Sequence, residues 1–145
     1  VVEDLARSAV SAGFTHVFIM GDHGTGQDEL ELAARNVSAA APAGVRVIYV
    51  RELYYGSRTA DSSYLVAHGL PTNEHAGPGD TSELMALDST GQWVRHDQLG
   101  AARGKPEPET GVSGDPTKAS VAMGRLFLQH KVDAAVNAIR RELAR

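Results

Sequence analysis

The 145-residue sequence contains no cysteine. Disulfide bonds, zinc-finger sites and a thiol nucleophile are therefore excluded, whereas histidine and carboxylate side chains can still bind a metal. The sequence also has no stripe of basic residues, and its net charge is −4. Because phosphate binding needs clustered lysine and arginine side chains, we do not expect nucleic acid as a partner.

Long apolar runs are absent too, and the longest stretch is far too short to span a bilayer. No signal-peptide pattern is visible. We therefore expect a soluble, cytoplasmic protein with no membrane partner. The pattern Gly-x-Ser-x-Gly is also missing, which argues against a Ser-His-Asp hydrolase of the α/β-hydrolase type. Length and composition, with 42% hydrophobic and 22% charged residues, are typical of one globular domain covering residues 1–145.

Apolar periodicity predicts alternating helices and strands in the first third of the chain. We expect helices over residues 2–12 and 27–41, and strands over residues 15–20 and 45–50. This order is typical of a parallel sheet covered by helices.

Shorter elements are predicted in the remainder. We expect helices over residues 60–67 and 81–87, followed by a long surface connection over residues 100–116. Asp115 before Pro116 is typical of a helix start, and this last helix should run to about residue 144. Its predicted core-facing stripe comprises Val132, Val136, Ile139 and Leu143.

A glycine-rich turn, Gly21–Gln27, lies between the first predicted strand and the helix after it. Ligands of parallel α/β sheets bind at the carboxyl ends of strands, and glycine lets the backbone approach them closely. His23 would lie at this crevice, where an imidazole can bind a metal. Asp22 is a second candidate ligand, or a partner that orients a histidine. A plain strand-to-helix connection and a phosphate-binding loop remain alternatives, although the loop lacks the Walker lysine.

A second turn, His75–Ser82, also opens a helix. A carboxylate at Asp80 would be stabilised by the helix N-terminus. The alternative is that Asp80 is only an N-cap, with Glu83 completing a capping box, and that His75 is a plain loop histidine. The remaining histidines are interpreted as structural or exposed: His16, His68, His96 and His130.

Three segments together resemble the creatininase family. The segment from Gly21 to Gln27 is similar to the family's GDHGGNQ-type motif, and the segment from His75 to Ser82 is similar to its HAGxxETS motif. The segment from Gly111 to Ser120 resembles its GVxGDPxxAS stretch. The three segments occur in the family's order and extend over essentially the whole chain.

The resemblance implies a three-layer, doubly wound, mostly parallel sheet with helices on both faces. It also implies hydrolysis of a non-peptide C–N bond, in a linear or cyclic amide, at zinc, manganese or iron. His23 matches a family metal ligand, with Asp80 and Asp22 as further candidate ligands. His75 matches a histidine implicated in proton transfer, and Gly24 and Gly77 would line the substrate. Family members form homo-oligomers, often hexamers, and act on small-molecule amides.

The sequence also departs from the family pattern. Thr25 stands where creatinine-hydrolysing members place a carboxylate ligand, and Trp93 is the only tryptophan, so the resemblance argues against creatinine as the substrate. In the family, a Glu-x-His pair and a further Asp lie in an N-terminal part that this sequence does not contain. Since Val1 falls inside a predicted helix, we expect a fragment or a missing N-terminal segment. A catalytically incomplete binding or structural fragment is therefore the alternative to an amidohydrolase.

Overall fold

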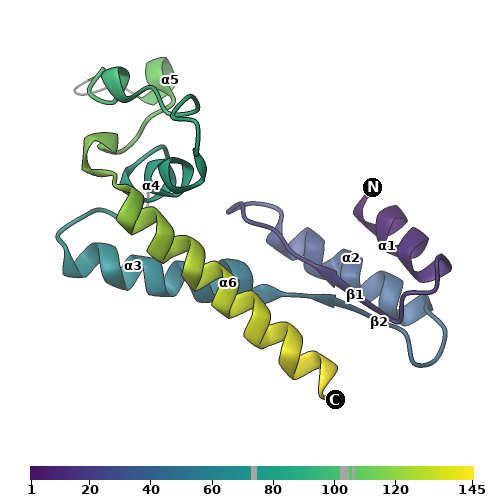
Figure 1. The fold of residues 1–145 in the computed structure, drawn as a ribbon. Coiled ribbons are helices and arrows are strands. Elements are labelled where there is room, and N and C mark those ends of the chain that lie inside the picture. The colour runs from purple at the N-terminus through teal and green to yellow at the C-terminus, as the bar shows by residue number, and fades with distance from the viewer. Residues whose placement is uncertain (73–74, 102–104, 106) are drawn as a thin grey trace. The chain divides into compact units, whose positions relative to one another are not determined.

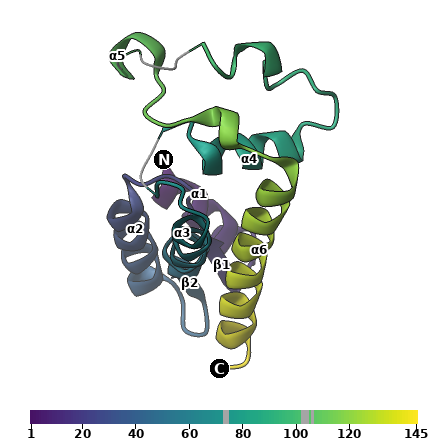
Figure 2. The same cartoon turned by 90° about the vertical axis from the view of Figure 1, so that its left-hand side faces the viewer.

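A computed structural model describes residues 1–72, 75–101, 105 and 107–145 of the chain. The chain forms two compact units, each considered by itself: Val1–Gly56 with Lys131–Arg145, and Ser57–His130. Helix α6, Val121–Leu143, continues from one unit into the other (Figures 1 and 2). The interpretation of residues 1–145 as one domain stays a prediction.

The first unit has the predicted order of helix, strand, helix and strand (Figure 1). The two strands pair in parallel, with Val17 opposite Val47. The α/β class and the parallel pairing are therefore confirmed. The four elements are α1 (Val2–Ser11), β1 (His16–Ile19), α2 (Gln27–Ala40) and β2 (Arg46–Tyr49).

Helices pack on both faces of this two-stranded sheet, because successive strand side chains point to opposite sides. On one face, Ile19 and Val47 form a core with the buried face of α2 and with α1. On the other face, Val50 packs against Ala135 and Ala138 of α6. The described residues of this first unit thus form a mixed helix and strand structure around a small parallel sheet.

The predicted apolar stripe on the last helix is wrong. Val132 and Leu143 are 54% and 57% exposed, whereas the small residues Ala135 and Ala138 are buried. Ile139 alone of the predicted stripe packs against the core. Alanine lets a helix backbone approach a sheet closely. The buried face of α6 in this unit is therefore formed by small side chains rather than by large apolar ones.

The second unit is mainly helical. Its core includes Leu65, Met123 and Phe127, the last only 1% exposed. The described part of the predicted connection over residues 100–116 contains one helical turn, and the rest of it lies outside the described residues. The elements besides α6 are α3 (Ser57–Ala67), α4 (Pro78–Leu87), η2 (His96–Gln98), α5 (Glu107–Thr110) and η3 (Pro116–Lys118).

Three predicted helix starts shift. Helix α3 begins at Ser57 rather than at residue 60. Helix α4 begins at Pro78 with Gly77 as its N-cap, so the alternative that Asp80 is the N-cap is wrong. Asp115 caps the short 3-10 helix η3 by accepting a hydrogen bond from the Thr117 amide at 3.1 Å. Among the helices of the described residues, none is both long and apolar enough to cross a membrane.

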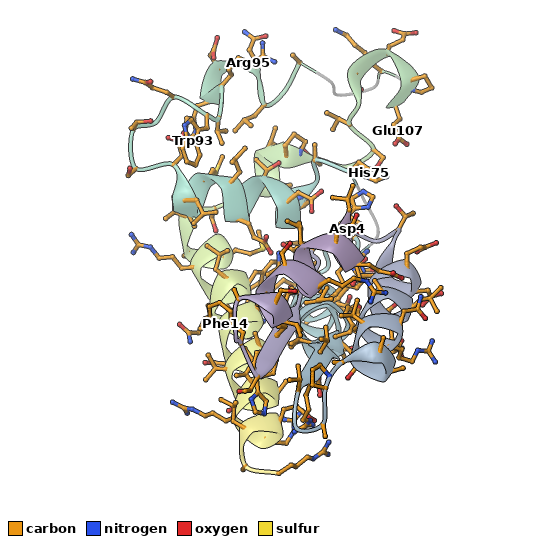
Figure 3. The ribbon with its side chains drawn as sticks, turned by 90° about the vertical axis from the view of Figure 1, so that its right-hand side faces the viewer. Asp4, Phe14, His75, Trp93, Arg95 and Glu107 are labelled. Carbon is orange, nitrogen blue, oxygen red and sulfur yellow. The ribbon has the colours of Figure 1, made fainter. Side chains whose placement is uncertain are left out.

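The loop after α4 is built around the carboxylate of Asp88. One oxygen accepts hydrogen bonds from the amides of Thr90 and Gln92 at 3.2 and 3.1 Å, and the other from those of Trp93 and Val94 at 2.7 and 3.2 Å. Desolvation raises the pKa of Asp88, but these amides and the Thr90 hydroxyl together lower it from 3.8 to about 2. Trp93 is 60% exposed on this loop (Figure 3).

We expect acid to release this loop through Asp88. The folded-state pKa lies below the unfolded value, so the carboxylate stabilises the loop above pH 3.8 and loses that effect as the pH falls through about 2. Trp93, the only tryptophan, reports the change by fluorescence. Asp88→Asn should weaken the loop at pH 7 and flatten the response between pH 4 and 2. Parallel acid profiles for wild type and variant would contradict this assignment.

Candidate functional site

His23 lies in the turn between β1 and α2, and its side chain is exposed. Its Nδ1 is 2.9 Å from the Thr25 hydroxyl and 3.2 Å from the Thr25 amide nitrogen, both of which can donate to it. The Thr25 carbonyl oxygen, at 3.3 Å, instead suits the tautomer with the proton on Nδ1. That tautomer leaves a lone pair on Nε2, which is the usual arrangement of a metal-binding histidine. Thr25 therefore orients the His23 ring in either state.

Asp22 is held by a residue that lies 109 positions away in the sequence. Its Oδ2 is 2.7 Å from Nζ of Lys131 on α6. The Lys131 side chain is only 17% exposed, whereas that of Asp22 is 53% exposed. An ammonium group at this distance neutralises the carboxylate and competes with a metal ion for that oxygen. Asp22 is thus better placed to fix the turn to α6 than to act as a primary metal ligand.

Gln27, the first residue of α2, is only 3% exposed and binds the backbone of the His23 turn through its side chain. Its amide donates to the carbonyl of His23 and accepts a hydrogen bond from the hydroxyl of Tyr49 on β2. Burial raises the pKa of Tyr49, which keeps this hydroxyl protonated as a donor. The sequence pattern placed Gln27 in the turn but gave it no role, because a single polar residue at a helix start carries no signal of burial.

We expect Gln27→Leu to destabilise the chain by about 1–3 kcal/mol, since it leaves the Tyr49 hydroxyl and the His23 carbonyl without this partner. Tyr49→Phe should cost about 1 kcal/mol, and the double variant should cost less than the sum of the two. Urea unfolding measures all three. Gln98→Leu is the control, because Gln98 is exposed. Equal effects of the Gln27 and Gln98 variants would contradict the role of Gln27.

The second turn is a tight structure around Ala76, which has a positive φ of 50°. Oδ2 of Asp80 accepts the Ala76 amide at 3.1 Å, and the Thr81 hydroxyl donates to the Ala76 carbonyl at 3.2 Å. Asp80 lies in the first turn of α4, and Gly77 is buried at its N-cap. The observed role of Asp80 is thus to hold the backbone that follows His75, whose own side chain is exposed (Figure 3).

The second and third family-like segments meet in this unit. Ser113 accepts the amide of His75 at 2.6 Å through its hydroxyl, and its own amide donates to the His75 carbonyl at 3.0 Å. Ser82, which is fully buried, accepts the amide of Ser120 at 2.9 Å through its hydroxyl. Two segments 38 residues apart are therefore joined at both ends, a pairing that the sequence pattern did not predict.

The predicted site residues are divided between the units. His23, Asp22 and Gly24 lie in the first unit, and His75, Gly77 and Asp80 lie in the second. The resemblance implies that these residues belong to one site, and this stays a prediction. Within the described residues, no three histidine, aspartate or glutamate side chains form a group that could hold a metal ion. His23 has the chemistry of a single ligand, whereas Asp22 and Asp80 each already have one oxygen engaged.

The phosphate-binding alternative for the first turn is not favoured by the charges at the start of α2. The first turn of this helix carries Asp28 and Glu29. These carboxylates oppose the attraction that a helix N-terminus otherwise exerts on an anion.

Comparison with protein families identifies the family of the chain. The family model described as creatininase, or creatinine amidohydrolase, matches residues 1–139 of the chain. The chain belongs to the creatininase family. Comparisons with curated proteins and with solved structures found no match. The match extends through all three segments that resemble the family, so an amidohydrolase-type function is the starting point for this creatininase-family chain.

Proposed function

We propose that this chain is a metal-dependent amidohydrolase that cleaves a non-peptide C–N bond in a small linear or cyclic amide. The observation that carries the proposal is the family match over residues 1–139. The construction of both turns supports it, because each fixes its backbone through buried or paired polar groups and leaves an imidazole exposed. By family resemblance we also propose a three-layer, doubly wound, mostly parallel sheet with helices on both faces, and a homo-oligomer, hexameric in form.

His23 is the proposed protein ligand, oriented by Thr25, and Asp80 and Asp22 are proposed as weaker contributors. A divalent ion such as zinc, manganese or iron would supply an activated water and polarise the amide carbonyl. The chain's own part is to orient and protonate. His75 donates a proton to the leaving nitrogen, while Gly24 and Gly77 let the backbone approach the substrate.

The experiment is a metal titration of the 145-residue chain with a panel of lactams and cyclic imides, with ring opening followed by NMR. We expect hydrolysis to rise saturably with zinc or manganese and to disappear on chelation. The metal should bind weakly, because catalytic zinc sites use three protein ligands and no such group forms among the described residues. His23→Ala should lower the metal affinity by at least about tenfold. A folded chain that hydrolyses none of the panel at saturating metal would overturn the proposal.

A further inference from the structure

A π-helical segment lies at the same sheet edge as the His23 turn. Because β1 and β2 are parallel, their carboxyl ends share one edge. The His23 turn follows β1, and the π-helix η1, Glu52–Gly56, follows β2. Single π-helical turns are rare and are frequent at functional sites. Nothing in the sequence pattern predicted this segment or gave it a role.

Tyr54 of η1 extends directly to the residue after His23. A Cβ atom placed on Gly24 would lie 3.0 Å from the Tyr54 hydroxyl oxygen, which is closer than side chains normally approach. The phenol therefore occupies the space that a side chain at position 24 would need. Glycine at position 24 and tyrosine at position 54 are complementary in shape.

The neighbours of Tyr54 hold the aromatic pair in place. The ring of Tyr55 meets that of Tyr54 edge to face, with centroids 5.2 Å apart. The Arg51 guanidinium lies 4.2 Å from the Tyr55 ring centroid and is 3.7 Å from a Glu31 carboxylate oxygen. Aromatic and cation–π contacts of this kind favour one ring orientation. The Tyr54 hydroxyl is thus held beside the His23 turn before any ligand arrives.

We infer that Tyr54 is a substrate-positioning residue of the His23 turn, and that its hydroxyl donates a hydrogen bond to the carbonyl oxygen of a small amide. The substrate class rests on the proposed function, whereas the position rests on the contact with Gly24. Tyrosine suits this role because its hydroxyl is a directional donor on a rigid ring. Glycine at position 24 suits this role because a Cβ atom there would require the Tyr54 hydroxyl to move by a few tenths of an ångström.

The test titrates the full chain, labelled with ¹³Cζ-tyrosine and free of metal, with succinimide. The chain has four tyrosines, and loss of one resonance in Tyr54→Phe assigns Tyr54. We expect that resonance to shift saturably in the wild type. Tyr54→Phe should weaken succinimide binding by about five- to tenfold, as for a lost neutral hydrogen bond. Tyr55→Phe, the matched control, should change it by less than about twofold.

Gly24→Ala tests the position of Tyr54 by a second variant. It should move the Tyr54 resonance and weaken succinimide binding, with Tyr54 itself unchanged in sequence. No saturable shift in the wild type, or equal weakening in the Tyr54 and Tyr55 variants, would overturn the inference. Succinimide binding through Tyr54 without metal-dependent hydrolysis would overturn the proposed reaction and leave the inference standing. Metal-dependent hydrolysis that is unaffected by Tyr54→Phe would overturn the inference about Tyr54 and leave the proposed reaction standing.

Discussion

Gly124→Ala should destabilise the second unit by at least about 3 kcal/mol, at the upper end of the cost of overpacking. A Cβ atom at Gly124 would lie far inside van der Waals contact with the carbonyl group of Ser82, and 2.9 Å from the Ala86 Cβ. The Ser82 carbonyl is backbone of α4 and cannot rotate away. Helices α4 and α6 would have to separate, and the hydrogen bond from Ser120 to the Ser82 hydroxyl would be strained.

The sign of this effect makes it a sharp test. Glycine in a helix is ordinarily less stable than alanine by about 1 kcal/mol, so an exposed helical glycine would give a gain. Gly79→Ala on α4 is the control, because a Cβ there meets only the Phe127 ring at an ordinary 3.5 Å. We expect Gly79→Ala to lie between no change and a gain of about 1 kcal/mol. Urea unfolding followed by Trp93 fluorescence measures both variants, and equal stabilities would refute the close approach of the helices.

Local patterns in the sequence were sufficient for the first unit. The predicted helices over residues 2–12 and 27–41 and the predicted strands over residues 15–20 and 45–50 agree with the structure to within about one residue at each end. These segments succeed because their apolar periodicity, their glycine breaks and their burial all point to the same element. The π-helix η1 was missed because a wide turn has no characteristic residue preference.

Burial on α6 could not be predicted in the same way. The pattern of Val132, Val136 and Leu143 has ideal helical spacing, yet these side chains are exposed. The buried positions are alanines, which a hydrophobic pattern weights lightly. Which face of α6 is buried depends on how closely the helix approaches the sheet, and that distance is a property of the tertiary structure.

In the candidate site, too, local features could be predicted from the sequence and contacts between distant segments could not. The sequence made His23, His75 and Asp80 candidates from short segments, because glycine-rich turns that precede helices are local features. It could not identify Lys131 or Ser113, whose partners lie 109 and 38 residues away. Contacts at such separations depend on the assembled chain and leave no periodicity in it. Even the local role of Asp80 was not fully predicted from the sequence. Its carboxylate accepts a hydrogen bond from the Ala76 amide, and the N-cap of α4 is Gly77 rather than Asp80.

His75→Gln should reduce kcat/KM for amide hydrolysis by about 10²- to 10⁴-fold, the range for loss of a general acid, with little change in stability. The structural contacts of His75 are made by its backbone, whose amide and carbonyl both bond to Ser113. The exposed imidazole is therefore dispensable for folding. His96→Gln is the control, since His96 is also exposed and lies in η2.

Substrates with different leaving groups distinguish a proton-donating role of His75 from an effect on the turn alone. An amide whose nitrogen leaves readily, such as a nitroanilide, needs little protonation in the transition state. If His75 protonates the leaving nitrogen, His75→Gln should lose activity mainly on unactivated lactams and retain most of it on the nitroanilide. Ser113→Ala, which disturbs the turn itself, should instead slow both substrates alike. Equal losses on both substrates for His75→Gln would contradict the proton-transfer role of His75.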